Sequence, residues 1–317
     1  MTNFGQSVKA AFFYIMQSKF YKGVLFVFLG AICFSTKGIF AKLAFRYGVD
    51  GLQILTLRML FALPFYIIIL IREYKTQPAP IVKNDWINIV TLGLIGYYLA
   101  ALFDFLGLQY VSASLERNII FTYPTFVLLM SRIFFKRKIH AIQIIAVAIC
   151  YTGILLAFYS DKASYASSNL MKGTVFVLLS SVTYALYLVK SDGLIKNVGT
   201  IRFTCISMIV SCVAVLVHYL FVHGIDIFSF PYQVYLIGVG VAIISTVFPS
   251  FLMTKGIEFI GSSNMAIIAS VGPIATIFLS NFILKESISF LHIVGTVLVL
   301  VGVLIISVKG NKKTITP

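Results

Sequence analysis

Two cationic side chains interrupt long apolar stretches near the start of the chain. Lys37 lies in the run 23–45 and Arg58 in the run 51–71. If each run is a helix rising about 1.5 Å per residue through a hydrocarbon core of about 30 Å, Lys37 lies about 9 Å and Arg58 about 11 Å below the same membrane surface. Charges at such depths usually face the interior of a helix bundle. The pair therefore predicts a cationic site for a carboxylate or a phosphate.

A structural role is the alternative for both cations. The Lys37 stem could carry its ammonium outward to the membrane surface, and Arg58 could pair with Asp104. Asp104 and Glu116 are the carboxylates nearest to span interiors on this side, and a surface position is expected for both. Proton relays usually rest on a carboxylate at the midplane, which this reading lacks. The pattern therefore favours uniport or exchange.

Four tyrosines and two prolines fall near the middle of other apolar runs. A hydroxyl in the middle of a bilayer needs a partner, which either a cavity wall or an interhelical hydrogen bond would supply to Tyr97, Tyr98, Tyr123 and Tyr184. Tyr98, Tyr123 and Tyr184 are the candidates for the substrate site. Pro124 and Pro273 each remove one backbone hydrogen bond and free a carbonyl. Each proline is therefore either a simple kink or a helix break at a binding site.

No catalytic or metal-binding motif accompanies these residues. The four cysteines, Cys33, Cys150, Cys205 and Cys212, lie within apolar runs and form no Cys-x-x-Cys pair, and the four histidines are scattered. The nucleophile elbow, the P-loop and the His-Glu-x-x-His pattern are absent from the sequence. The sequence therefore predicts neither an enzyme nor a metal or cofactor site.

The elements that must position the candidate residues are ten apolar runs, each long enough to cross a bilayer as a helix of about 20 residues. Hydrophobic residues make up 60% of the chain, charged residues make up 11%, and the mean hydropathy is +0.99. No soluble domain could bury that much apolar surface. We therefore expect an all-α polytopic membrane protein. The runs lie near 23–45, 51–71, 86–107, 115–135, 140–159, 173–191, 201–222, 232–254, 264–284 and 289–308.

The chain repeats itself at an offset of 149 residues. The stretch 107–114 (Gly-Leu-Gln-Tyr-Val-Ser-Ala-Ser) recurs as 256–263 (Gly-Ile-Glu-Phe-Ile-Gly-Ser-Ser), and the same offset carries Pro124 onto Pro273. Each half holds five runs, so the second copy must enter the membrane from the opposite side. Two inverted five-helix repeats around a central site are typical of alternating-access transport.

Positive charges orient the chain. With the N-terminus in the cytoplasm, seventeen of the 25 Lys and Arg residues lie inside, six lie outside, Arg117 among them, and Lys37 and Arg58 lie within spans. This bias predicts that both termini are cytoplasmic. The same rule accounts for the net charge of +15, which therefore does not indicate a nucleic-acid partner.

The expected organisation has five parts. A cytoplasmic lead forms either an amphipathic helix on the membrane surface or a partly ordered tail. Two repeats of five membrane helices follow, joined by a polar external linker, and a basic cytoplasmic tail ends the chain. The lead covers 1–21, the first repeat 22–159, the linker 160–171, the second repeat 172–308 and the tail 309–317.

The order of these motifs resembles the EamA family of the drug/metabolite transporter superfamily over about 22–159 and 172–307. The family's opening helix is matched by 30–42 with Lys42, and its recurrent arginine is matched by Arg58. Its mid-helix prolines are matched by Pro124 and Pro273. Its acidic corner is matched by Lys285 with Glu286, and its last-span glycines are matched by Gly295 and Gly302. Four positions depart from the family pattern: Phe34 stands for a frequent tryptophan, Arg137 takes the first acidic corner, Ala146 replaces a glycine, and Lys37 replaces a small or amide residue.

The resemblance implies a secondary carrier or exchanger for a small organic metabolite, such as an amino acid or another carboxylate-bearing solute. It implies a place in the plasma membrane (the inner membrane of a bacterium), export more often than uptake, and a path lined by spans one, three, four, six, eight and nine. Spans five and ten look peripheral and would suit a contact between protomers of a homodimer. Its partners would be the substrate and the lipid bilayer. A membrane receptor or scaffold that kept the fold without transport is the alternative.

Overall fold

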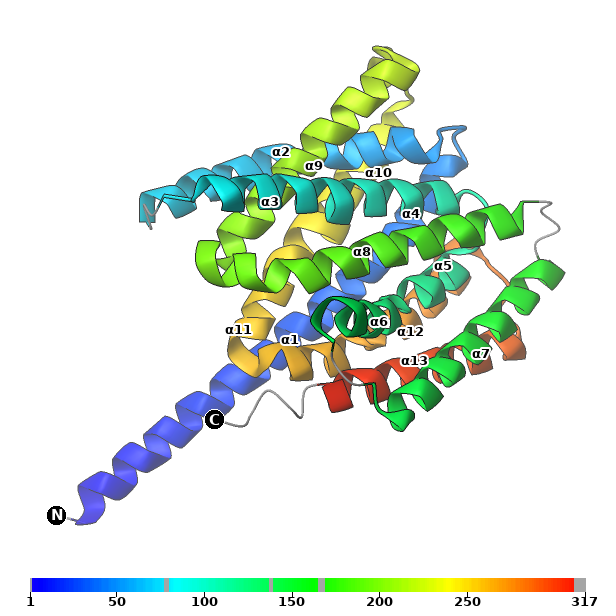
Figure 1. The fold of residues 1–317 in the computed structure, drawn as a ribbon. Coiled ribbons are helices and arrows are strands. Elements are labelled where there is room, and N and C mark those ends of the chain that lie inside the picture. Colours follow the sequence, from blue (N-terminus) through cyan, green and yellow to red (C-terminus); the bar gives the residue numbers. More distant parts are fainter. Residues whose placement is uncertain (1, 77–79, 137–138, 165–168, 311–317) are drawn as a thin grey trace.

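The computed structural model describes residues 2–76, 80–136, 139–164 and 169–310. Within these ranges the chain forms helices and no strand, which confirms the predicted all-α class (Figure 1). The first half contains α1 (Thr2–Phe45), α2 (Gly51–Thr76), α3 (Lys83–Gly93), the π-helix η1 (Leu94–Leu99), α4 (Ala100–Leu108), α5 (Ala113–Ile120), α6 (Tyr123–Phe135) and α7 (Ala141–Ser164). The second half contains α8 (Leu170–Val198), α9 (Thr200–His223), the 3-10 helix η2 (Asp226–Phe228), α10 (Tyr232–Ala242), the π-helix η3 (Ile243–Val247), α11 (Phe248–Ala269), α12 (Val271–Leu279), the π-helix η4 (Ser280–Leu284) and α13 (Phe290–Gly310).

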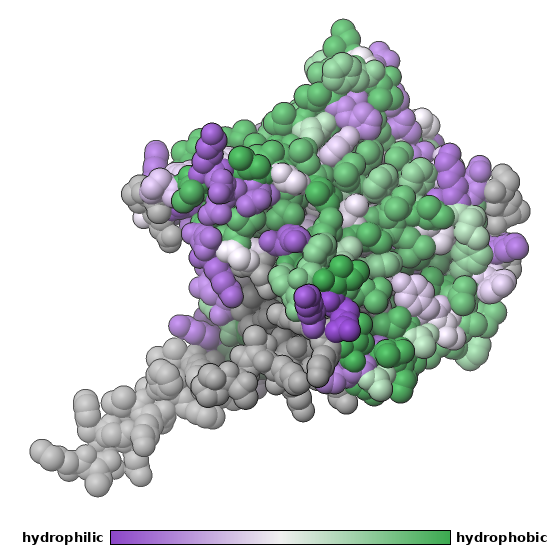
Figure 2. Space-filling model, in the orientation of Figure 1, coloured by the Kyte–Doolittle hydropathy of each residue, from purple (hydrophilic) through white to green (hydrophobic). Residues whose placement is uncertain are grey.

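Nine helical stretches of the described chain are long and apolar enough to cross a membrane. A shorter apolar helix, Phe290–Ile306 within α13, follows them, and the predicted count of ten depends on it. Hydrophobic side chains cover the broad middle of the visible face, and hydrophilic ones gather mostly toward its opposite ends (Figure 2). This distribution is the one that a helix bundle needs when lipid tails surround its middle.

Two helices from opposite ends of the sequence, α7 and α13, lie side by side and antiparallel (Figure 1). Glycines let their backbones approach: a Cβ on Gly295 would lie 2.5 Å from the Gly153 carbonyl oxygen, and one on Gly302 would lie 2.6 Å from that of Ala146. Close approach at small residues is how membrane helices gain packing energy. The small-residue faces of these two helices are therefore covered within one chain, and a homodimer contact through them stays a prediction.

The same device joins α4 to α8 and α1 to α11. A Cβ on Gly107 would lie 2.5 Å from the Val177 side chain, and a Cβ on Gly256 would overlap the Val27 side chain. Gly107 and Gly256 are matched residues of the sequence repeat at the offset of 149. Val27 and Val177 are matched at an offset of 150, within the similar stretches 22–29 and 172–179. The contacts are therefore reciprocal between the halves, as two copies of one unit would make them.

Local irregularities recur at the repeat offset too. The π-helices η1 and η3 begin 149 residues apart. Lys136 and Lys285, which directly follow α6 and η4, are also 149 residues apart and have φ angles of 52° and 61°. Both lysines are the positive-φ non-glycine residues of the described chain, a conformation that few side chains accept. These recurrences support the predicted repeat, while its inverted orientation stays a prediction.

Two predicted boundaries differ from the structure. The lead runs without a break into the first span, because α1 begins at Thr2. The linker was expected from residue 160, yet α7 continues to Ser164, and both Ser160 and Asp161 are buried. The Ser160 hydroxyl lies 2.6 Å from that of Ser289, and Asp161 accepts a hydrogen bond of 3.0 Å from the Ser112 amide. These contacts hold the last turns of α7 against the bundle. The tail residues 311–317 lie outside the described chain.

We expect Gly153→Ala to destabilise the protein by about 1–3 kcal/mol, the usual effect of an added methyl group in a tight core. Its Cβ would overlap the Gly295 carbonyl oxygen, and backbone cannot give way as a side chain can. Gly193→Ala in α8 is the matched control, because within the described chain nothing beyond the local backbone of its own helix lies within 4 Å of that Cβ. Thermal unfolding in detergent should show a lower Tm for Gly153→Ala alone. Equal Tm values would contradict the close approach of α7 and α13.

Candidate functional site

An ion cluster lies where α1, α4 and α5 meet. The Lys37 ammonium donates to Asp104 Oδ2, and it donates to Glu116 Oε1 at 3.0 Å. The side chains of Lys37, Asp104 and Glu116 are 13%, 5% and 1% exposed. Gly38 leaves space for the Glu116 carboxylate, since even a Cβ on Gly38 would lie 3.4 Å from Glu116 Oε2. One ammonium therefore holds two buried carboxylates.

The expected surface position of Asp104 and Glu116 is wrong. Both carboxylates are buried, and Lys37 neither extends to the surface nor stands free as a cation. Burial of a carboxylate is tolerable only when a partner offsets the loss of water, and Lys37 is that partner. Asp104 consequently pairs with Lys37 rather than with Arg58. The sequence did not reveal this pairing because the three residues lie on separate helices.

Arg58 approaches the π-helix η3 instead. Its Nε donates to Thr246 Oγ1 at 2.8 Å, and its Cζ lies 5.5 Å from the centre of the Phe105 ring. Thr246 donates its own proton to the Val241 carbonyl at 2.9 Å, so a hydroxyl lone pair faces Arg58. Among the described residues, no carboxylate lies within ion-pair distance of this guanidinium. Lys37 and Arg58 are thus differently placed: one is neutralised, and the other is held by a neutral hydroxyl.

Arg117 is the cation that sequence reasoning placed outside the membrane. It follows Glu116 on α5, and its Nη2 lies 3.5 Å from Ser35 Oγ on α1. A Cβ on Gly272 would lie 2.7 Å from the same nitrogen, so the glycine of α12 makes room for it. Among the described residues, Arg117 Nε is buried and has no hydrogen-bond partner. The missed signal was its position inside the apolar run 115–135.

Four tyrosines form a connected aromatic group beside Arg117. The rings of Tyr123 and Tyr184 meet edge-on with centres 5.3 Å apart, and Tyr184 stacks on Tyr187 at 5.9 Å. Tyr187 contacts Tyr97 at 4.9 Å, and their hydroxyls lie 3.2 Å apart. Arg117 interacts electrostatically with Tyr123 and Tyr184. The structure therefore brings Tyr123 and Tyr184, two of the three predicted site tyrosines, together with Tyr97, and it adds Tyr187.

Tyr98 points elsewhere. Its hydroxyl lies 3.1 Å from His218 Nδ1 on α9, and the two rings meet edge-on at 6.0 Å. Tyr97 and Tyr98 are neighbours in the π-helix η1, and neighbouring side chains of a helix leave it in different directions. Tyr98 thus makes the interhelical hydrogen bond that was the alternative to a cavity wall.

The fourth span is interrupted directly before Pro124. α5 ends at Ile120 and α6 begins at Tyr123. The proline nitrogen cannot donate to the carbonyl four residues earlier, and its ring would clash with it. The Ile120 carbonyl instead accepts a hydrogen bond from Ser181 of α8 at 3.2 Å.

The ninth span is interrupted at the equivalent place. α11 ends at Ala269 and α12 begins at Val271, two residues before Pro273. Ser35 of α1 lies with its hydroxyl 2.9 Å from the Gly272 carbonyl oxygen. At each interruption, a serine from the first helix of the other half therefore donates a hydrogen bond to a backbone carbonyl. The interruptions flank Arg117, and breaks of this kind expose backbone polar groups to a binding site.

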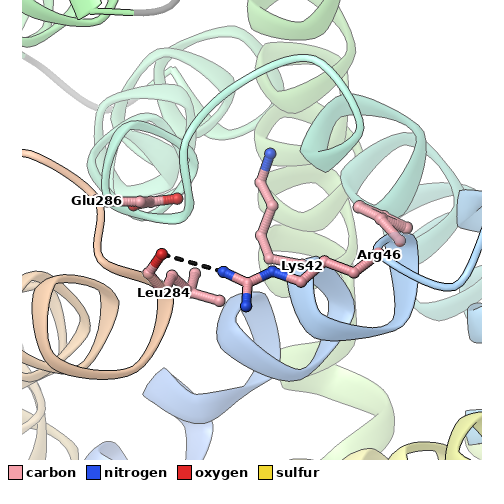
Figure 3. A pocket seen from close by; sticks show the side chains of 5 residues that line it. Lys42, Arg46, Leu284 and Glu286 are labelled. Carbon is pink, nitrogen blue, oxygen red and sulfur yellow. Dashed lines mark hydrogen bonds between the residues drawn. The ribbon is translucent and has the colours of Figure 1, made fainter.

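A second polar group lies at one end of the bundle. A cavity of about 260 Å³ is lined by Lys42, Phe45, Arg46, Leu284 and Glu286 (Figure 3). Arg46 Nη2 donates to the Leu284 carbonyl at 3.0 Å. Glu286 lies in the connection between two spans of the sequence, after η4 and before α13, and burial raises the pKa of its carboxyl group.

Glu286 joins this cavity to α5. Its Oε1 accepts a hydrogen bond of 3.3 Å from the amide of Ala113, the first residue of that helix. A carboxylate is stabilising at the positive end of a helix. Nearby, the Ser114 and Ser280 hydroxyls lie 2.7 Å apart. The ends of α1, α5 and η4 are thus tied together at this side of the ion cluster.

Comparison with known proteins places this arrangement in a wider group. A model of the EamA-like transporter family matches the chain twice, over 21–159 and 171–308. "Uncharacterized transporter YcbK" of Bacillus subtilis is 32% identical over 282 residues, which cover 86% of this chain and 88% of that protein. An uncharacterized transporter of Clostridium kluyveri is 25% identical over 304 residues, covering 92% and 94%. A solved structure described as "Crystal structure of protein" shares the fold with a TM-score of 0.60 at 13% identity, over 89% of this chain and 95% of that one.

Proposed function

Because the chain belongs to the EamA-like transporter family, we propose that it is a secondary carrier or exchanger that moves a small organic metabolite across the cell membrane by alternating access. Membership confirms the resemblance seen in the sequence and makes the chain a multi-pass membrane protein. The metabolite, the direction and the mechanism are the proposal. A carboxylate-bearing solute such as an amino acid is the substrate class that we infer from the site.

The observation that carries this proposal is Arg117 beside two interrupted helices, with Arg58 as a second cation at the π-helix η3. Arg58 and Arg117 face hydroxyls rather than carboxylates, and Arg117 Nε has no partner. Guanidinium groups bind carboxylates in a planar, two-bonded geometry. Tyr123 and Tyr184 would form an apolar wall with hydroxyl groups next to Arg117. Lys37 would act through Asp104 and Glu116, and Tyr98 would tie η1 to α9.

Alternating access would use the predicted inverted repeats, 22–159 and 172–308. Inverted copies can exchange conformations, which opens a central site first to one side and then to the other. The reciprocal glycine contacts and the paired π-helices support such a duplication. The contacts of Glu286 and of Ser114 with Ser280 would close the outer side in this conformation. Cytoplasmic termini, the plasma membrane and export rather than uptake belong to the same proposal.

A receptor or scaffold of the same fold is the other candidate. Such a protein has no need of charges inside the membrane, each of which costs about 2.5–3.5 kcal/mol on insertion scales. Asp104, Glu116, Lys37 and Arg117 would each carry such a cost at their places in the proposed spans. We therefore favour the carrier, acting without catalysis and without a cofactor.

Deleting the protein from its cell and restoring it tests the proposal. For an exporter we expect one carboxylate-bearing metabolite to accumulate inside the deletion strain and to return to its former level when the parent protein is restored, both measured by mass spectrometry. Restoration with Arg117→Gln should fail at equal membrane abundance, because a hydrogen bond to a charged group contributes about 1.5–3 kcal/mol. A metabolite that falls on deletion would indicate uptake. Unchanged metabolite levels would favour the receptor or scaffold.

A further inference from the structure

The ion cluster holds one more acid than its ammonium can neutralise. Lys37 contacts both Asp104 and Glu116, so one ammonium holds two acidic groups. Two carboxylates in one buried site disfavour each other's ionised form, and a proton on one of them relieves that repulsion. Among the described residues, Asp104 Oδ1 is buried and has no hydrogen-bond partner, which leaves an oxygen for that proton.

The surroundings supply other charges, none of which takes the place of the proton. The ionisable groups that interact with the acid pair come from α1, α2 and α5, and those near Arg117 come from α6 and α8. They are Lys37, Lys42, Arg58, Arg117, Tyr123 and Tyr184. Lys37 is the ammonium that touches the pair, and two carboxylates that share a poorly solvated site disfavour each other's charged form.

We propose that Asp104 and Glu116 form a proton-binding site that couples proton movement to transport of the carboxylate-bearing substrate. The inference rests on the proposed function and names its coupling ion. A proton from water binds one oxygen of the pair, and the charge of the cluster rises by one. The proton leaves from the same oxygen when the substrate leaves.

The sign of the coupling follows from the charges. A substrate carboxylate near Arg117 and Arg58 repels the acid pair and therefore strengthens proton binding. By linkage, the bound proton strengthens carboxylate binding by the same factor. Coupling factors between sites typically lie at about 5–150-fold. Proton and carboxylate should consequently cross the membrane together in one direction. A cationic substrate would compete with the proton and reverse the relation.

The proton site can be tested without a substrate. The purified protein is reconstituted in vesicles of phosphatidylethanolamine and phosphatidylglycerol, and infrared difference spectra are recorded between neutral and alkaline pH. We expect the carbonyl band of one protonated buried carboxyl group to disappear on the alkaline side. Glu116→Gln and Asp104→Asn should each abolish the change. Asp226→Asn at the exposed η2 and Glu286→Gln at the outer cavity should both retain it.

Coupling is tested in the same vesicles with pyranine, a pH-sensitive dye, trapped inside. Each of the standard amino acids and a set of mono- and dicarboxylates is added outside as probe, and mass spectrometry measures what enters. In the parent, a carboxylate that enters should acidify the interior in proportion. In Glu116→Gln its flux should continue with that acidification lost. The parent measurement stands even if both acid variants fail to fold.

The outcomes separate this inference from the proposed function. Entry of a carboxylate without acidification by the parent would leave the carrier intact and overturn proton coupling. An infrared change that survives both acid variants would overturn the proton site. If no carboxylate enters, the proposed substrate class is wrong and coupling to it falls with it, while the infrared result still decides the site.

Discussion

Lys37→Met should destabilise the protein by about 3–5 kcal/mol, the usual effect of removing one partner from a buried ion pair. The substitution leaves Asp104 and Glu116 buried, at 5% and 1% side-chain exposure, with no ammonium between them. Methionine fills a similar volume, so the loss would be electrostatic rather than a cavity. We expect a markedly lower Tm in detergent at neutral pH. Lower pH should recover part of the loss, because a protonated carboxyl group carries no charge.

Two comparisons isolate the electrostatic origin of this effect. Lys37→Met combined with Asp104→Asn and Glu116→Gln should regain most of the lost Tm, since removing a whole buried ion cluster is often neutral. Lys255→Met is the matched control. Its pair with Glu258 is 53% and 58% exposed, and exposed pairs contribute about 0–1 kcal/mol. If Lys37→Met unfolds at the same temperature as Lys255→Met, the ion cluster does not stabilise the fold.

The spans were predictable because the membrane demands long apolar helices, and such runs are visible in a sequence. The all-α membrane fold and the family membership are confirmed. Helix ends were less predictable. Ser160 and Asp161 read as a polar linker, but hydrogen bonds to Ser289 and Ser112 keep them within α7. Those partners are far away in the sequence, and no local pattern reveals them.

The site was only partly predictable, for a similar reason. Counting residues along a span predicts depth, and it placed Lys37 and Arg58 within spans. It left Asp104, Glu116 and Arg117 at the surface or outside, although the structure brings them into the bundle. Depth says nothing of which helix face carries a residue, so the pairing of Lys37 with Asp104 and Glu116 stayed hidden. The π-helix η1 adds a further difficulty, because its extra residue changes the directions that a regular helical period would predict for Tyr97 and Tyr98.

Arg58→Gln should weaken binding of an anionic substrate by about 1.5–3 kcal/mol if the guanidinium bonds to it directly. Glutamine is neutral but still a hydrogen-bond donor, so Thr246 would keep a donor within reach while the charge is lost. Insertion into the membrane should not suffer, since removing an intramembrane charge makes insertion easier. Transport of the metabolite identified in cells, measured in vesicles, should show a raised KM.

Three further variants distinguish a binding role for Arg58 from a structural one. Arg58→Lys should restore transport only in part, because lysine keeps the charge but lacks the planar fork that matches a carboxylate. Arg72→Gln, at the exposed far end of α2, should transport as the parent does. Thr246→Val removes the hydroxyl that accepts the hydrogen bond of Arg58 but leaves the charge of Arg58. If Arg58 has only a structural role, Thr246→Val should lose as much stability as Arg58→Gln. If Arg58→Gln folds and transports at the parent rate, Arg58 does not contact the substrate. If the substrate proves to be a cation, the assignment fails on the sign of its charge.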